Sequence, residues 1–239
     1  MLVANALSEV GRVRKDNEDN YLVSTERGLF VVADGMGGHA GGEVASSIVK
    51  RVLDEEIGPP LVDLDCEKVL LNALIKANDL ILRQGQDRAC AYFGMGTTVT
   101  AAIFQAEKLY VAHIGDSRAY LFREGCLHLL TQDHSLVNEL LQKGELTPEE
   151  AENHPRRNIL TRALGINEKP QIDVLNLSVQ KGDLLLLCTD GLYNQVYEEE
   201  LADNLSGEGL LKVKVEKMVN LALERGGNDN ITAVLVQYA

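Results

Sequence analysis

Five aspartates stand at the boundaries of strongly apolar segments of the 239-residue chain: Asp19, Asp34, Asp116, Asp190 and Asp229. Aspartate is a common turn residue, which would explain any one of them. Five at strand ends are harder to explain in this way, and grouped carboxylates stay ionised together only if cations neutralise them. Oxygen ligands with few histidines and no cysteine select hard ions such as Mg²⁺ and Mn²⁺. The pattern therefore predicts a divalent-metal centre.

The glycine-rich stretch after Asp34 is the densest of these motifs. An apolar run over residues 29–33 stops at Asp34, and five glycines follow within eight residues. Residues 35–40 also fit the dinucleotide-binding pattern G-x-G-x-x-G/A. However, the acids about 20 residues on, Asp54 and Glu55, fall inside a predicted helix and not at the end of a second strand. A purely structural glycine turn is the other alternative, and a metal-holding Asp-Gly is favoured over both.

Such a centre suits the hydrolysis of phosphate esters. If Asp34 bridges two ions about 3.5–4 Å apart, a water that they share becomes acidic enough to act as the nucleophile. A phosphate also needs a fixed cation, and Arg14 lies five residues before Asp19, at the same predicted sheet edge. A guanidinium matches a phosphate group with two parallel hydrogen bonds. The alternative for Arg14 is a solvated surface arginine.

Composition excludes several other classes of function. The net charge of −13 and the pI near 4.8 argue against binding of nucleic acid or of a membrane surface. The four cysteines have no C-x-x-C spacing, so zinc and redox motifs are absent, and they are typical of reduced residues in a cytoplasmic protein. The sequence has no signal-peptide pattern and no uncharged stretch that suits a membrane span. We expect one domain over residues 1–239.

The hydrophobic pattern predicts the elements that position these acids. We expect a strand over residues 2–7 and a hairpin of strands 21–25 and 29–33, which brings Asp19 beside Asp34. Two amphipathic helices follow, one from about residue 40 and one with its apolar face over residues 69–81. Four strands at 97–104, 108–114, 119–123 and 126–130 have hairpin-length separators and predict an antiparallel meander.

The second half of the chain predicts an insertion and a return to the sheet. Residues 132–165 are polar and carry a capping box at Thr147, with short helices over 136–142 and 148–153, so we expect an insertion over the sheet. Strands at 172–179, 183–189 and 231–237 and helices at 198–205 and 210–224 follow. Leu184 to Leu187 are apolar on both faces of their strand, which is therefore covered twice. Two packed antiparallel sheets with helices outside each satisfy these patterns, and we expect Asp190 and Asp229 to meet at one sheet edge.

Eight motifs occur in the order seen in one known family. They are RKDNED at 14–19, DGMGGH at 34–39, GTT at 96–98, GDSR at 115–118, DHS at 133–135, LTRALG at 160–165, TDGL at 189–192 and DNIT at 229–232. In this the chain resembles the bacterial branch of the PPM (PP2C) family of metal-dependent protein serine/threonine phosphatases, over essentially its whole length. The resemblance implies a four-layer α-β-β-α sandwich, with residues 132–165 as a flap beside the catalytic centre.

The resemblance also implies roles for individual residues. Asp34 would bridge two Mn²⁺ or Mg²⁺ ions; the Gly35 carbonyl would bind one, and Asp190 and Asp229 the other. Glu18 and Asp19 would act through metal-bound waters, and Asp116 with Asp190 would hold a third ion. Eukaryotic members carry a histidine directly after the Asp-Gly pair, whereas this chain has Met36 there and its nearest histidine is His39. The proton donor to the leaving alcohol is then His39 or a metal-bound water, unless His39 only orders its loop.

The expected activity is hydrolysis of phosphoserine and phosphothreonine in proteins, without a phosphoenzyme, by a cytoplasmic monomer that opposes a serine/threonine kinase. Two alternatives stay open: a non-catalytic relative that binds phosphoproteins, and a phosphatase for small metabolites that shares the metal centre. A haloacid-dehalogenase mechanism is disfavoured because its D-x-D-x-T motif is absent.

Overall fold

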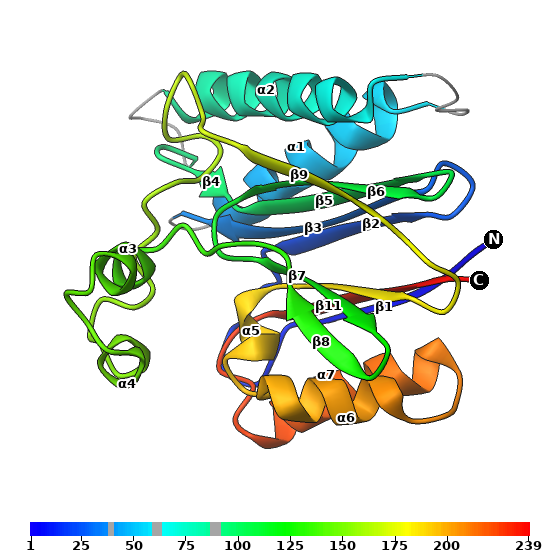
Figure 1. The fold of residues 1–239 in the computed structure, drawn as a ribbon. Helices are drawn as coiled ribbons and strands as arrows, with labels where there is room; N and C mark the ends of the chain where they lie inside the picture. Colours follow the sequence, from blue (N-terminus) through cyan, green and yellow to red (C-terminus); the bar gives the residue numbers. More distant parts are fainter. Residues whose placement is uncertain (38–40, 59–63, 87–91) are drawn as a thin grey trace.

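Two antiparallel sheets packed face to face form the centre of the protein (Figure 1). The computed structural model describes residues 1–37, 41–58, 64–86 and 92–239. The first sheet has the strand order β1-β11-β10-β7-β8. Its strands are β1 (Leu2–Glu9), β11 (Ile231–Tyr238), β10 (Leu184–Cys188), β7 (Arg118–Arg123) and β8 (Cys126–Leu129).

The second sheet has the order β2-β3-β5-β6-β9, with a short strand, β4, paired to the end of β3. Its strands are β2 (Asp19–Ser24), β3 (Leu29–Met36), β4 (Gly96–Thr97), β5 (Val99–Gln105), β6 (Lys108–Ile114) and β9 (Asp173–Ser178). The two chain ends meet at one end of the sandwich, where the amino group of Met1 donates to the carbonyl of Ala239 over 2.8 Å.

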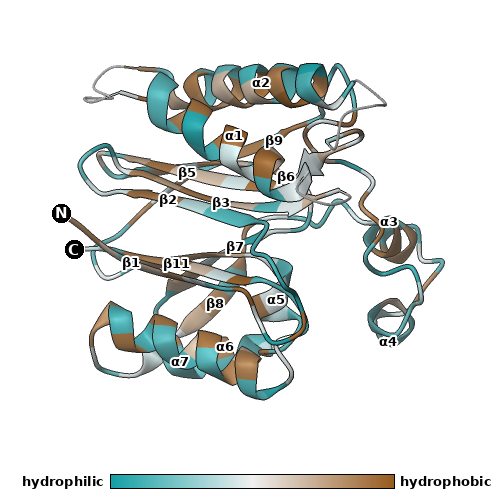
Figure 2. Cartoon of the chain, turned by 180° about the vertical axis from the view of Figure 1, so that it is seen from behind, coloured by the Kyte–Doolittle hydropathy of each residue, from teal (hydrophilic) through white to brown (hydrophobic). Residues whose placement is uncertain are grey.

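Helices cover the outer face of each sheet, which completes a four-layer α-β-β-α sandwich. The second sheet is covered by α1 (Gly41–Glu56) and α2 (Cys66–Gly85), and the first by α5 (Asp190–Tyr193), α6 (Glu198–Ser206) and α7 (Leu211–Glu224). In Figure 2 these helices carry both polar and apolar residues, as expected for helices with one face on a sheet. The predicted fold class is confirmed.

Strand β10 shows why this layering forms. Leu184, Leu186 and Cys188 pack in the core under α5–α7, whereas Leu185 and Leu187 pack in the core between the two sheets. A strand that is buried on both faces requires a hydrophobic layer on each side, as its apolar run predicted. A third core lies between α1, α2 and the second sheet.

The expectation of a four-stranded meander in the middle of the chain was wrong. Strands β5 and β6 form one hairpin and β7 and β8 another, but the two hairpins lie in different sheets, so there is no four-stranded meander. The short link over residues 115–117 crosses from one sheet to the other. Gly115 permits this with a φ of +109°, and a Cβ there would lie 2.5 Å from the Cβ of Thr98. A link of this length could equally have closed a hairpin.

The segment 132–165 also differs from its predicted place. Its helices α3 (Leu136–Gln142) and α4 (Pro148–Glu152) lie beside the sandwich and not over a sheet face, and neither helix has a buried residue (Figure 1). The predicted capping box at Thr147 is present. The short helix α5, which begins at Asp190, was not predicted.

Candidate active site

The β2–β3 hairpin brings the first two predicted carboxylates together. Asp19 and Asp34 lie directly opposite each other in the register of the two strands, as the hairpin predicted. Asp19 is buried, with 6% of its surface exposed, whereas Asp34 lines an open cavity. Adjacent strands therefore place both carboxylates at the same sheet edge, with Asp34 at the cavity wall and Asp19 buried beneath it.

The other sheet contributes Asp190 and Asp229. Asp190 lies two residues after the end of β10 and Asp229 two residues before the start of β11. These two strands are neighbours, with Cys188 opposite Ala233. The backbone N–H of Thr189 extends the pairing by donating to the carbonyl of Thr232 over 3.1 Å. The predicted meeting of Asp190 and Asp229 at one sheet edge follows from this geometry, although three helices separate the strands along the chain.

Asp19 joins the two sheets through two threonines that sequence reasoning missed. The hydroxyls of Thr189 and Thr232 donate to Oδ2 of Asp19 over 2.8 and 2.6 Å. Both threonines belong to the motifs that contain Asp190 and Asp229, but nothing in their local sequence shows that they contact a residue near the N-terminus. The contacts fix the Asp19 carboxylate between the sheets.

The backbone around Asp34 and Gly35 is held closely. The N–H of Asp34 donates to Oγ1 of Thr98 over 3.0 Å, and the N–H of Thr98 donates back to the carbonyl of Asp34 over 2.9 Å. The N–H of Gly35 donates to the carbonyl of Glu18 over 3.2 Å. A Cβ on Gly35 would lie 2.1 Å from the carbonyl oxygen of Gly42 at the start of α1. Only glycine allows the strand and the helix to approach this closely.

Asp116 reaches the same cavity on the link between β6 and β7. Its carbonyl accepts a 3.0 Å hydrogen bond from the hydroxyl of Tyr193, the last residue of α5. The hydroxyls of Ser117 and Thr98 are 2.7 Å apart, which ties the link to the residue whose side chain supports the backbone of Asp34. The crossing between sheets is therefore what brings Asp116 to the centre.

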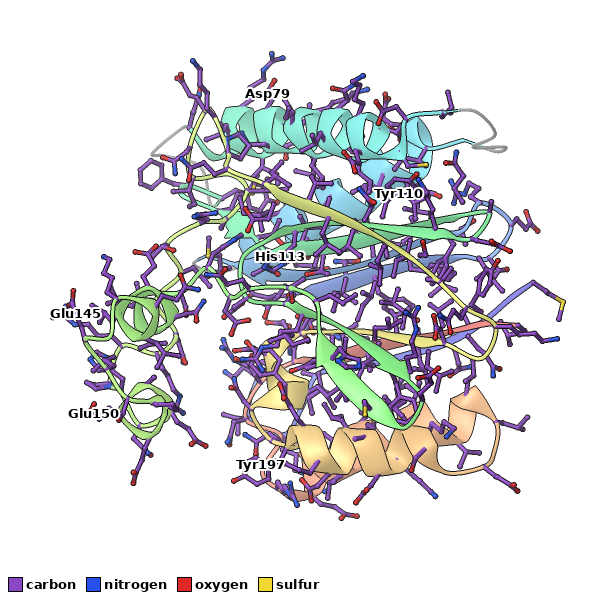
Figure 3. All side chains as sticks on the ribbon, in the orientation of Figure 1. Asp79, Tyr110, His113, Glu145, Glu150 and Tyr197 are labelled. Atoms are coloured by element: carbon purple, nitrogen blue, oxygen red, sulfur yellow. The ribbon has the colours of Figure 1, made fainter. Side chains whose placement is uncertain are left out.

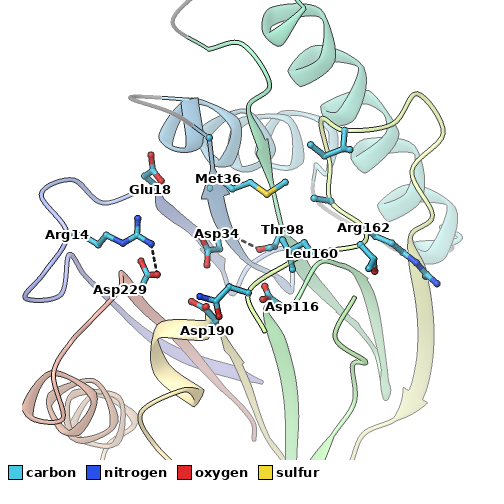
Figure 4. Close-up of a pocket in the computed structure, with 16 residues that line it drawn as sticks. Arg14, Glu18, Asp34, Met36, Thr98, Asp116, Leu160, Arg162, Asp190 and Asp229 are labelled. Atoms are coloured by element: carbon cyan, nitrogen blue, oxygen red, sulfur yellow. Dashed lines mark hydrogen bonds and ion pairs between the residues drawn. The ribbon is translucent and has the colours of Figure 1, made fainter. Parts of the chain in front are cut away.

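Arg14 lies at this edge too, as predicted, and its Nη2 donates to Oδ2 of Asp229 over 2.7 Å (Figure 4). This pair is half-exposed. The hydrogen bond to Asp229 is the main reason that the pKa of Arg14 is raised. The loop that carries Arg14 is fixed by Asn230, whose Nδ2 donates to the carbonyls of Val10 and Asp16.

These groups line a cavity of about 390 Å³. Figure 4 shows its wall, on which five carboxylates and two guanidinium groups lie: Glu18, Asp34, Asp116, Asp190, Asp229, Arg14 and Arg162. Met36, Leu160 and Ile166 give the cavity an apolar side. The segment 132–165 thus supplies residues to the wall, as expected for a flap beside the centre.

Burial and mutual repulsion make these carboxylates hard to ionise together. Burial, and then the neighbouring carboxylates, raise the pKa of Asp19 to about 7, although Thr232 and Thr189 oppose the shift. Burial and the charge of Asp229 raise the pKa of Asp190 to about 6. For the same reasons the pKa values of Asp34 and Asp116 lie well above the usual range. Cations bound in the cavity would remove this repulsion.

The donor set fits hard divalent ions. Oδ1 of Asp19 and Oδ1 of Asp190 are buried and have no hydrogen-bond partner among the described residues. Buried carboxylate oxygens without partners are costly, and a metal ion satisfies them. In the described ranges no three Asp, Glu, His or Cys side chains already lie in the arrangement of a metal site. Binding an ion would therefore draw carboxylates such as those of Asp34, Asp190 and Asp229 closer together.

His39 lies outside the described residues, so the structure does not place it. None of the helices in the described part of the chain is long and apolar enough to cross a membrane.

The fold and the site define a class: α-β-β-α sandwiches with a carboxylate-lined cavity at one edge of the two sheets. The family model for protein phosphatase 2C matches residues 10–235. The serine/threonine phosphatase stp of Listeria welshimeri is 41% identical over 233 residues, which are 95% of this chain and 92% of that protein.

Solved structures agree with this assignment. The S. agalactiae serine/threonine phosphatase matches with a TM-score of 0.93 at 35% identity, covering 100% of each chain. The catalytic domain of the serine threonine protein phosphatase PstP, solved in complex with two manganese ions, matches with a TM-score of 0.87 at 36% identity over 99% of this chain and 97% of that one. The chain belongs to the protein phosphatase 2C family, and the predicted family is confirmed.

Proposed function

We propose that this protein is a metal-dependent protein serine/threonine phosphatase that hydrolyses phosphoserine and phosphothreonine without a phosphoenzyme. The observation that carries the proposal is the meeting of Asp34, Asp116, Asp190 and Asp229, from four separate parts of the chain, around one cavity that Arg14 also borders. Similarity to phosphatases named for serine and threonine supports the substrate class.

Carboxylates and a backbone carbonyl would hold two Mn²⁺ or Mg²⁺ ions. Asp34 would bridge them, with Gly35 on one and Asp190 and Asp229 on the other, while Glu18 and Asp19 act through waters. A third ion would bind between Asp116 and Asp190. When bound, the ions supply a water of lowered pKa and neutralise phosphate charge.

Residues of the chain itself bind and orient the substrate and supply the proton. Arg14 binds two phosphate oxygens and orients the ester for attack by water at phosphorus, with the P–O bond to the serine or threonine side chain breaking. Thr189 and Thr232 hold Asp19 in a fixed orientation, so that it need not reorganise during turnover. The departing oxygen needs a proton, for which His39 is the candidate on this chain.

Hydrolysis of phosphoserine, phosphothreonine and phosphotyrosine peptides in Mn²⁺ tests the proposal. We expect turnover of the first two, abolished by excess EDTA and by Asp34→Asn. Asp79→Asn, an equal change of charge on the outer side of α2 (Figure 3), is the control and should keep wild-type turnover. Turnover that persists in EDTA, or activity only on small phosphate esters, would contradict it.

The proposal also covers the partners of the protein and its cellular location. The substrates would be phosphoproteins and a cognate serine/threonine kinase, with the chain acting as a monomer in the cytoplasm. The three cysteines that the structure describes are unpaired, which supports a reducing compartment.

A further inference from the structure

His134 is a buried residue that the proposed reaction does not use. It lies at the start of the segment 132–165, and 4% of its surface is exposed. Its backbone N–H donates to the carbonyl of Gly115 over 2.7 Å, and the N–H of Gly115 donates to Nδ1 of its ring over 3.1 Å. Two hydrogen bonds therefore fix the residue that precedes Asp116. Gly115 has no side chain of its own with which to hold this turn.

The contact with Gly115 also decides where the proton of the ring sits. Because Nδ1 accepts a hydrogen bond from a backbone N–H, it carries no proton, so the proton of the neutral ring is on Nε2. Nε2 then donates to Oδ2 of Asp173, 3.1 Å away. The other oxygen of Asp173 accepts from Nη1 of Arg162 over 3.2 Å, and the same Nη1 lies 3.3 Å from Nε2 of His134. One carboxylate thus holds both His134 and an arginine that lines the active-site cavity.

His134 is itself held firmly. Its ring packs against that of His113, near the end of β6, at a centroid distance of 4.8 Å. Its carbonyl accepts a 2.8 Å hydrogen bond from the N–H of Thr161, so both ends of the segment 132–165 meet at this residue. Asp116 and Arg162, on the cavity wall in Figure 4, are the two groups that this network reaches.

We propose that His134 is a positioning residue for the phosphatase reaction, which sets the Asp116 turn through Nδ1 and the Arg162 guanidinium through Nε2 and Asp173. The inference rests on the proposed function of the cavity. The alternative is a histidine that only fills and stabilises this corner of the core.

The two ring nitrogens can be tested separately, because Oδ1 of asparagine occupies the place of Nδ1 and the Nε2 amide of glutamine occupies the place of Nε2. His134→Asn keeps the acceptor for Gly115 and loses the donor to Asp173. His134→Gln keeps the donor and loses the acceptor. Asp173→Asn weakens only the Arg162 branch, and the same two substitutions at the exposed His128 are controls.

The experiment measures hydrogen exchange of residues 115–117 together with kcat and KM on a phosphothreonine peptide. We expect His134→Gln to lose protection at 115–117 and to lower kcat at least about tenfold, since displacing an active-site group by ~1 Å can cost about 100-fold. His134→Asn should keep both the protection and kcat, and should raise KM by the same factor as Asp173→Asn. If His134 only fills the core, His134→Gln and His134→Asn should show the same changes in exchange protection, kcat and KM.

The proposal is overturned if His134→Gln exchanges like the wild type at 115–117, or if it loses protection there and keeps wild-type kcat. Because exchange needs no turnover, the first of these outcomes is decisive even if the wild type hydrolyses no phosphopeptide. Absence of wild-type hydrolysis would instead contradict the proposed function.

Discussion

Asp19 is held differently from the other carboxylates of the centre. One of its oxygens accepts from two threonine hydroxyls of the opposite sheet, and the other has no partner among the described residues. A buried carboxylate with one satisfied oxygen is oriented while the second stays free for a ligand. We infer that Asp19 contributes to the centre from a more buried position than Asp34, which lies opposite it in the hairpin and lines the cavity.

Arg14 gives a first prediction at the residue scale. Arg14→Ala should raise KM for a phosphothreonine peptide roughly 10–150-fold, because a charge-assisted contact is worth roughly 1.5–3 kcal/mol. Its ion pair with Asp229 is half-exposed, so Mn²⁺ affinity by calorimetry should not fall. Lys15→Ala, the exposed neighbour, is the control. An unaltered KM in Arg14→Ala would make Arg14 a surface charge only.

Asp116 gives a second prediction, because asparagine serves a turn as well as aspartate does. The carbonyl that Tyr193 binds survives the substitution, so Asp116→Asn should keep its melting temperature. Its kcat should fall at least about tenfold, or roughly 1.4 kcal/mol of transition-state stabilisation. Wild-type kcat at saturating Mn²⁺ would reduce Asp116 to a turn residue.

At the scale of elements, the close approach of β3 and α1 requires glycine at position 35. Gly35→Ala places a Cβ 2.1 Å from the carbonyl of Gly42, so strand and helix must move apart. We expect a loss of about 1–3 kcal/mol in the free energy of unfolding by chemical denaturation in EDTA. Gly58→Ala, where no atom lies within 4 Å of the added Cβ, should be neutral. Equal stability of the two variants would show that the junction adapts freely.

Local sequence patterns predicted most of the helices and strands. They could not predict contacts between residues that are far apart in the chain. The alternation around residues 21–33 specifies the hairpin that pairs Asp19 with Asp34, because hairpin and register are local properties. Whether residues 115–117 close a hairpin or cross between sheets depends on what Ser117 and Gly115 meet, and those partners, Thr98 and His134, lie 19 residues away in each direction. The bonds from Thr189 and Thr232 to Asp19 span 170 and 213 residues and have no sequence signal.

At the scale of the whole molecule, the buried His113 predicts a dependence of stability on pH. Burial, and then the nearby His134, lower the pKa of His113 to about 4, from about 6.5 in an unfolded chain. The unfolded state therefore binds this proton more readily, so stability is complete above pH 6.5 and falls as the pH drops toward 4.

Between pH 8 and pH 5.5 the wild type should lose about 1 kcal/mol more than His113→Gln does. Chemical denaturation of both proteins in EDTA at the two pH values measures this difference, in which the contribution of the active-site carboxylates cancels. The same pH dependence in both proteins would mean that His113 takes up no proton in this range on unfolding.

The central claim is that carboxylates from both sheets form one metal centre with Asp34 between the ions. Calorimetric titration of the metal-free protein with Mn²⁺ tests this most directly, by comparing the wild type with Asp34→Asn. We predict two high-affinity ions in the wild type and the loss of both in Asp34→Asn, because the bridging carboxylate serves the two sites at once. Two ions bound with undiminished affinity by Asp34→Asn would contradict the account.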